Sequence, residues 1–208
     1  MDKIMECASN YKKLCSISYK FIVSYQRKTR EIKLDFRESD FFHLAGLQYL
    51  TDLAIPRNRK TILKCIMSEC LITDEVLCKS KYFSNKNSGV DIKSRIEELR
   101  FLEQYLDTDN MIKIFSVKDD VYLKSKIDAE YIIESKLKNC NTSVYIFLAR
   151  RSEDTDYYCV KSFFVKDKVI YGGQALYWMY KEKILEGRSR VLYSHKNFQV
   201  SNEKDGAI

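Results

Sequence analysis

The chain has 208 residues, of which 45% are hydrophobic and 31% are charged, and this balance excludes wholesale disorder. Its formal net charge of +7 permits a polyanionic partner without requiring one. No stretch approaches the roughly 18 consecutive apolar residues of a membrane span, and the charged N-terminus, MDKIMECASNYKK, lacks the apolar core of a signal peptide.

The cysteines and histidines are too few and too scattered for a metal site. The chain has seven cysteines and two histidines, and no two cysteines form a CxxC pair. An odd number of dispersed cysteines also argues against a secreted disulfide framework. We therefore expect reduced, mostly buried thiols in a cytoplasmic protein without a bound metal. The two glycines of YGG (172–173) match no GxGxxG or P-loop spacing, so we expect no nucleotide cofactor either.

The N-terminal part predicts a helix followed by a hairpin. Residues 2–15 form the helix, and 16–26 (SISYKFIVSYQ) alternate apolar and polar side chains, which is typical of a half-buried strand. A turn at 27–30 leads to a second alternating run, 31–36.

A cluster of helices follows. Ser39 or Asp40 caps a helix through DFFHLAGLQYL (40–50), on which His43 shares a stripe with two leucines and therefore points toward packed material. Gly46 is costly inside a helix, so we expect another backbone to approach it closely. Further helices are predicted at 56–70, 73–80 and 90–107.

The C-terminal half changes to the period of strands. Turns at 139–141 and 152–156 separate three of them, and ALYWMYKEKIL (175–185) reads as a short helix between the last two. The predicted fold is α+β, in which an N-terminal hairpin and helices pack on a C-terminal antiparallel sheet. It forms a single domain over 1–208 with a flexible tail at 201–208. The predicted strands are 112–116, 128–137, 143–150, 157–165 and 189–195.

Four stretches carry a resemblance to a known family. They are F…FFHLAGL (36–47), YIFLARR (145–151), KSFF (161–164) and IYGGQALYWMYKEKIL (170–185). In this order, after a hairpin, they resemble the fourth of the phage families named after barnase, EndoU, colicin nucleases and RelE. The resemblance spans about 16–198. It implies a barnase/RelE-like fold and a ribonuclease encoded by a phage or mobile element.

Metal-free RNA cleavage needs groups that move protons and cations that stabilise the phosphorane. We assign proton transfer to His43, because an imidazole titrates near neutral pH. Lys161 and Arg150 are the candidate phosphate-binding groups. Lys161 shares a strand face with Cys159 and Phe163, whereas Ser162 faces the opposite way.

Five further residues are candidates for binding RNA. The two tyrosines have rings that stack on bases, and the basic residues line one helix face; they are Tyr171, Tyr177, Arg57, Lys60 and Lys64. Each candidate also has a structural interpretation. His43 fits a hydrogen-bonded core histidine equally well, Lys161 fits an edge lysine that protects the sheet, and the other charges fit solvated surfaces.

Two functions therefore stay open. The first is a metal-independent, toxin-like endoribonuclease that binds RNA and is itself bound by an antitoxin or host protein. The second is a non-catalytic binding protein on the same scaffold, which engages a host protein or RNA and counters host defence. Only one convincing proton-transfer group is visible in the sequence, which leaves the choice open.

Overall fold

The computed structural model describes residues 2–84, 91–116, 127–136, 142–153, 155–167 and 171–198. The predicted tail at 201–208 and the predicted turn at 139–141 lie outside these residues. The helices of the described part are α1 (Lys3–Leu14), α2 (Phe41–Leu44), α3 (Ile62–Met67), α4 (Asp74–Leu77), α5 (Ile92–Leu99) and α6 (Leu102–Asp107), with short 3-10 turns η1 (Glu38–Asp40) and η2 (Leu47–Tyr49). The strands are β1 (Ile17–Tyr25), β2 (Lys28–Leu34), β3 (Met111–Phe115), β4 (Tyr131–Lys136), β5 (Thr142–Arg150), β6 (Tyr157–Asp167), β7 (Gly173–Leu185) and β8 (Arg188–Ser194).

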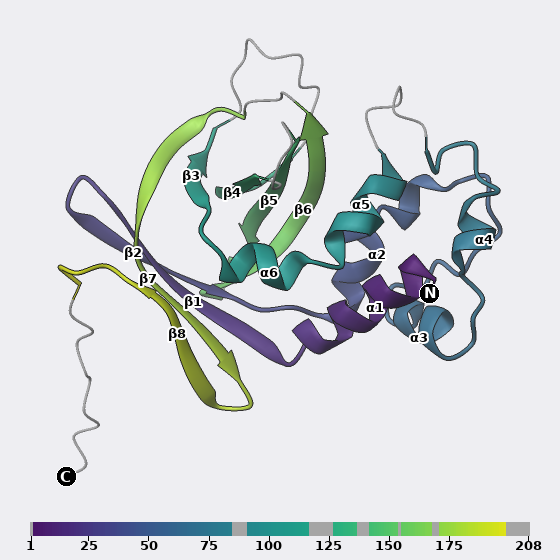
Figure 1. Cartoon of the computed structure of the whole chain (residues 1–208), viewed down its shortest axis with the longest axis horizontal. Helices are drawn as coiled ribbons and strands as arrows, with labels where there is room; N and C mark the ends of the chain where they lie inside the picture. Colours follow the sequence, from purple (N-terminus) through teal and green to yellow (C-terminus); the bar gives the residue numbers. More distant parts are fainter. Residues whose placement is uncertain are drawn as a thin grey trace.

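The strands close into a ring. Their order is β1-β2-β6-β5-β4-β3-β7-β8, and β1 also pairs with β7, so seven strands form a closed circuit and β8 lies outside it as an edge. The curvature of β3 to β7 is visible in Figure 1. All pairs are antiparallel except the short parallel contact between β2 and β6, which joins the N-terminal hairpin to the rest of the sheet.

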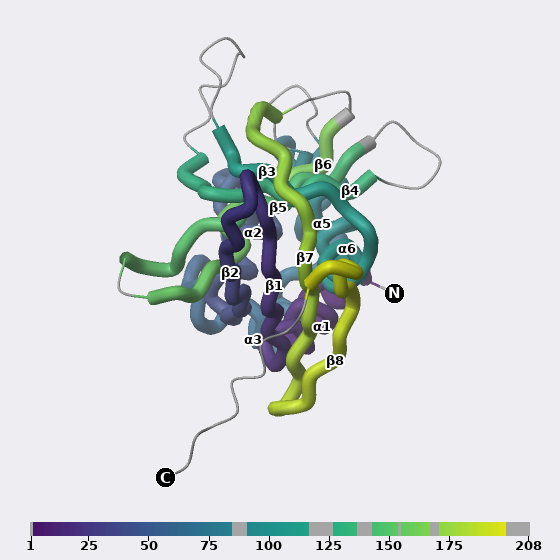
Figure 2. The backbone as a smooth tube through the Cα atoms, turned by 90° about the vertical axis from the view of Figure 1, so that its left-hand side faces the viewer, coloured from purple at the N-terminus to yellow at the C-terminus, as the bar shows by residue number. Residues whose placement is uncertain are grey.

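The helices α1 to α5 gather on one side of the strands, as Figures 1 and 2 show from two directions. The main core lies between them and the sheet, and it includes Phe21 of β1, Ile146 of β5 and Ile96 of α5. A second, smaller core covers the opposite face of β5 with Phe147 and Tyr145. Because both faces of β5 are covered, its side chains are almost continuously apolar.

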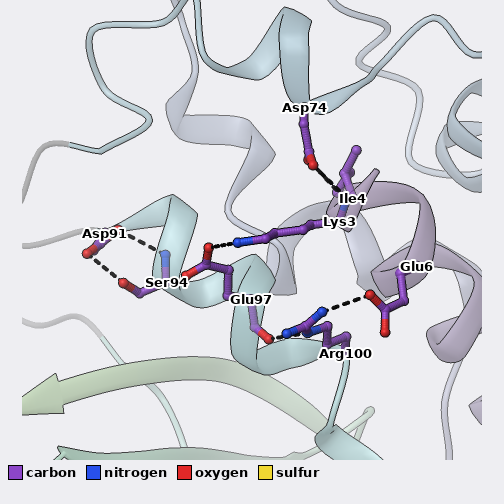
Figure 3. Close-up of polar contacts among 8 residues, drawn as sticks. All are labelled: Lys3, Ile4, Glu6, Asp74, Asp91, Ser94, Glu97 and Arg100. Carbon is purple, nitrogen blue, oxygen red and sulfur yellow. Dashed lines mark hydrogen bonds and ion pairs between the residues drawn. The ribbon is translucent and has the colours of Figure 1, made fainter. Parts of the chain in front are cut away.

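Carboxylates bind the N-terminal helix to its neighbours. Asp74, in the first turn of α4, accepts hydrogen bonds from the backbone N–H groups of Lys3 and Ile4 at 2.6 and 3.1 Å. Arg100, at the C-terminal end of α5, forms an ion pair with Glu6 of α1 at 2.8 Å. Figure 3 shows these contacts. The Asp74 contacts join α4 to α1, and the Arg100–Glu6 pair holds the end of α5 against α1 and so helps to position the residues that α5 presents toward β6.

The fold confirms the predicted α+β class, and most predicted elements are present. The N-terminal helix and all seven predicted strands occur, although the hairpin turn lies at Gln26 and Arg27, which both have positive φ as in a type I′ turn. The predicted helix at 90–107 is divided into α5 and α6, and the predicted helix at 56–70 is reduced to α3.

The predicted helix at 175–185 is wrong, because these residues belong to strand β7. The strand pairs with β1 along one edge and with β3 and then β8 along the other. Gly173 begins it with φ +149°, and a Cβ atom there would lie 2.2 Å from the backbone O of Ile114. Only glycine permits the close approach of β3 that this pairing requires.

Candidate functional site

The segment that carries His43 is a short helix closed by a left-handed glycine. Of the four residues of α2, only His43 is not buried. Gly46 adopts φ +77°, and its N–H donates to the O of His43 at 3.1 Å, which ends the helix. The predicted continuous helix at 40–50 is therefore wrong. The group that lies against Gly46 is the side chain of Arg95 rather than another backbone.

A β-bulge in β6 positions Lys161. Phe147 of β5 pairs with Ser162, but the next residue, Leu148, pairs with Val160, so Lys161 is an extra residue in its strand. Val160 and Phe163 are consequently both buried, while Lys161 is exposed. The predicted common face of Lys161 and Phe163 is wrong, because the bulge interrupts the alternation on which it rested. Bulges of this kind redirect side chains and are frequent next to active sites.

His43 and Lys161 line one pocket of about 410 Å³ between α2, β6 and the segments that precede α2 and α3. These two predicted residues come from distant parts of the chain. The pocket is lined by Arg37, Ser39, Asp40, His43, Arg59, Arg151, Cys159, Val160 and Lys161.

Positive charge exceeds negative charge in this pocket. Arg151 is the one lining arginine held by carboxylates: its Nη2 lies 2.9 Å from Asp40, and its Nε contacts Asp35. The salt bridges of the described residues include none for Arg37, Arg59 or Lys161. Three cations that have no salt bridge among the described residues are chemically suited to an anion with several oxygens, such as phosphate.

A hydrogen bond to Gln48, five residues later in the same segment, holds the His43 ring next to these cations. Gln48 Nε2 lies 2.9 Å from His43 Nδ1. Burial, and then the charges of Arg95, Arg59 and Lys161, lower the pKa of His43 from its usual 6.5, while Asp40 opposes this shift. The ring therefore loses its proton more readily than an exposed histidine.

Arg95 is a second unusual feature next to His43. It lies on α5 and is 3% exposed, with its guanidinium 4.6 Å from the ring centroid of Phe164. Its Nη2 is buried and has no hydrogen-bond partner in the described part of the chain. Burial lowers the pKa of Arg95 to about 10. An uncompensated cation under the α2 segment favours a neutral ring at His43.

The two carboxylate oxygens of Asp40 differ in their hydrogen bonds. Both the Nη2 of Arg151, at 2.9 Å, and the backbone N–H of Arg37, at 3.2 Å, bind Oδ2. No hydrogen bond to Oδ1 occurs among the described residues. Asp40 lines the same pocket as His43, so a carboxylate with one oxygen outside these hydrogen bonds is present there.

The structure does not bring the other predicted residues into the pocket. Arg150 is 49% exposed and pairs with Glu130 instead. Tyr171 is buried in the smaller core, and Tyr177 is 75% exposed on β7. The guanidinium of Arg57 donates to the backbone O atoms of Leu47, Leu50 and Leu53, Lys64 pairs with Glu69, and Lys60 is exposed beside Arg59.

Several lining residues escaped the sequence analysis because they lie in irregular segments. Arg59 follows Pro56 in a stretch without a helix, Arg37 precedes the turn η1, and Asp40 is the last residue of that turn. Side-chain direction in such segments follows from no periodic pattern. One signal was available: FRESDFFH places three charged residues within one or two turns of His43, and two of them, Arg37 and Asp40, line the pocket.

The described residues contain no cluster of three or more His, Cys, Asp or Glu side chains that could hold a metal ion. Their six cysteines are free; Cys7 and Cys65 are buried, but Cys70 and Cys78 are exposed, so the thiols are less buried than predicted. In the part of the chain that the model describes, no helix is both long and apolar enough to cross a membrane.

Comparison with known proteins gives one match. Neither a curated protein nor a solved structure matches the chain. A family model described as phage-Barnase-EndoU-ColicinE5/D-RelE like nuclease 4 matches residues 3–198. That span covers the hairpin, the helices and all strands of the ring. The chain therefore belongs to this family of phage nuclease-like domains.

Proposed function

We propose that the protein is a metal-independent endoribonuclease whose active site is the pocket around His43. The observation that carries the proposal is the meeting of His43 with Lys161, Arg59 and Arg37 around one cavity of about 410 Å³. A proton-transfer group among unpaired cations is what cleavage of a phosphodiester requires. The family assignment supports nuclease chemistry.

The reaction is attack by the ribose 2′-oxygen on the adjacent phosphorus. The new bond between the 2′-oxygen and phosphorus forms as the bond to the 5′-oxygen breaks, which leaves a 2′,3′-cyclic phosphate and a free 5′-hydroxyl. A carboxylate oxygen of Asp40 accepts the proton of the 2′-hydroxyl, and the imidazolium form of His43 donates its Nε2 proton to the departing 5′-oxygen, which leaves the ring neutral. Together they supply the pair of proton-transfer groups of which the sequence revealed only one.

The cations act on the charge that develops at phosphorus. Lys161 contributes a compact point charge, and the guanidinium groups of Arg37 and Arg59 contribute planar donors that suit phosphate oxygens. Because none of the three forms a salt bridge among the described residues, they need not break one to bind RNA. Lys60, exposed next to Arg59, extends the positive surface along the RNA strand.

Cleavage of a mixed-sequence RNA in the presence of a chelator tests the proposal. We expect the wild-type protein to cleave and His43→Ala to lose about 10²- to 10⁴-fold in rate, the usual contribution of acid–base catalysis. His195→Ala is the matched control, because it replaces the other histidine of the chain, which lies outside the pocket. Growth arrest on expression, relieved by His43→Ala, would extend the proposal to a toxin-like role in the cytoplasm.

A folded wild-type protein that cleaves no RNA would overturn the proposal. The same protein retaining RNA without cutting it, or retaining a host protein or antitoxin, would instead support the non-catalytic binding function. Cleavage that the chelator abolishes would show that the reaction depends on a metal ion, against the mechanism proposed here.

A further inference from the structure

The side-chain amide of Gln48 contacts the imidazole of His43 in a defined orientation. Gln48 belongs to η2, and the left-handed turn at Gly46 returns the chain so that its amide meets a ring five residues earlier. Gln48 Nε2 lies 2.9 Å from His43 Nδ1 and also 3.4 Å from the backbone O of His43. Two contacts to one residue define the amide more closely than one contact does.

The second contact determines which way the amide points. A backbone carbonyl oxygen only accepts hydrogen bonds, so the amide atom beside it must be the nitrogen. The reversed amide would place two oxygens against each other at that position. The Gln48 Oε1 atom is consequently left buried without a partner in the described part of the structure.

We propose that Gln48 is a positioning residue of this site, whose amide donates to His43 Nδ1 and so keeps a proton on Nε2, the ring nitrogen available to the pocket. With Nδ1 as an acceptor, the neutral ring carries its proton on Nε2, and the imidazolium carries a proton there as well. The ring therefore offers an N–H to the pocket in both charge states.

In the neutral ring this arrangement excludes a base at Nε2. Donation of the Nε2 proton to a leaving oxygen requires the imidazolium, in which Nδ1 also carries a proton and the Gln48 amide must turn its oxygen toward the ring. A base at Nε2 would need a bare nitrogen facing the substrate, which requires the opposite tautomer and a different partner at Nδ1. The assignment of His43 to the leaving 5′-oxygen rests on the RNA cleavage proposed above. The position of the proton on the neutral ring does not depend on that proposal. Asp40, which lines the same pocket, is then the group left to accept a proton.

The experiment is ¹⁵N NMR of the imidazole rings in the full chain, at a pH where the rings are neutral. The chain has only two histidines, so His195 serves as the internal reference. In the wild-type protein we expect His43 Nε2 protonated and Nδ1 bare. Gln48→Met keeps the length of the side chain but removes the donor, and should lower the ratio of the two tautomers about fivefold, the equivalent of one hydrogen bond of about 1 kcal/mol.

Gln48→Glu is the decisive variant, because its carboxylate accepts from Nδ1–H. We expect the proton of the neutral ring to move to Nδ1, while Gln174→Glu, at an exposed glutamine on β7, leaves the His43 ring unchanged. A wild-type ring protonated on Nδ1, or a Gln48→Glu ring that keeps the wild-type tautomer, would overturn the proposal. The expected tautomers in a protein that cleaves no RNA would support the role of Gln48 and reject the nuclease function separately.

Discussion

His43 is surrounded by more positive than negative charge, and its ionisation should reflect this. Arg95 approaches from α5, Arg59 from the loop before α3 and Lys161 from β6, while Asp40 is the acidic group that opposes them. The pocket also holds Arg37 and Arg151, the latter neutralised by its carboxylates. Burial and these cations place the pKa of His43 below 6.5.

The first prediction concerns the pH dependence of stability. Since the pKa of His43 is lower in the folded than in the unfolded chain, the unfolded state binds more protons between the two values. The contribution of His43 to the free energy of unfolding therefore rises with pH across that window and is complete above about 6.5. Urea denaturation from pH 5 to 7.5 should show a shallower slope for His43→Asn than for wild type. A steeper slope in the variant would contradict the assigned direction.

The second prediction concerns Lys161. Lys161→Met removes an exposed cation of the pocket, so we expect RNA cleavage to fall about 10²- to 10³-fold, as when one donor to a transition-state oxygen is lost. The free energy of unfolding should change by less than about 0.5 kcal/mol, because the side chain is exposed. Lys79→Met, at an exposed position of the far helix region, is the matched control for rate. Equal rates for both variants would remove Lys161 from the site.

Sequence analysis identified His43 and Lys161 because each is a polar residue in an apolar, periodic context. It selected Arg150 for the same reason, since Arg150 extends the alternating face of β5. The structure instead places Arg151 in the pocket, because that side chain turns toward Asp35 and Asp40 after the strand ends. These carboxylates belong to a segment more than a hundred positions earlier, so no local pattern could reveal them.

Among the structural elements, Arg151 connects the end of β5 to the segment that leads into α2. Its side chain is 9% exposed and binds both Asp35 and Asp40. Arg151→Ala would leave these two carboxylates without their shared cation, and we predict a loss of about 2 kcal/mol in the free energy of unfolding. The neighbouring variant Arg150→Ala breaks an ion pair whose partners are 49% and 44% exposed, and should cost less than about 1 kcal/mol. Chemical denaturation compares the two, and equal losses would argue against the connecting role.

Gly46 determines how the histidine segment ends, and its substitution gives a fourth prediction. Gly46→Ala places a Cβ in the left-handed region, which costs about 1–2 kcal/mol, and brings it to 3.4 Å from the Arg95 side chain. Gly187→Ala has nearly the same φ, +75°, with nothing within 4 Å, and isolates the backbone cost. Thermal denaturation should show Gly46→Ala to be at least as destabilising as Gly187→Ala. A stabilised Gly46→Ala protein would contradict this account.

Strands were easier to predict than helices in this chain. β1, β4 and β5 follow a clear alternation or a continuous apolar run, and these patterns survive in the fold. The prediction for 175–185 was wrong because the spacing of its apolar residues also fits a helix. Pairing on both edges of β7 makes the segment a strand. Tertiary contacts of this kind override the helical spacing of apolar residues, and the tyrosines and tryptophan of the segment also favour strands.

The closure of the ring was beyond sequence reasoning, because it depends on β1 meeting β7 across most of the chain. The fold class and the existence of the hairpin followed from periodicity, but strand order does not. Closure also separates the strands into two environments. β5 lies between β4 and β6 with both faces covered, whereas β8 pairs with β7 alone among the described strands and exposes Val191 and Tyr193.

The last prediction follows from this difference. Local opening free energies range from near zero up to the global value, depending on burial and pairing. Amides of β5 should exchange with solvent only through global unfolding, while those of β8 should open at a free energy at least about 2 kcal/mol lower. Native-state hydrogen exchange measured by NMR across a range of low denaturant concentrations would distinguish them. Equal protection in both strands would mean that β8 unfolds together with the closed ring, and that the ring's edge is stabilised by contacts other than its pairing with β7.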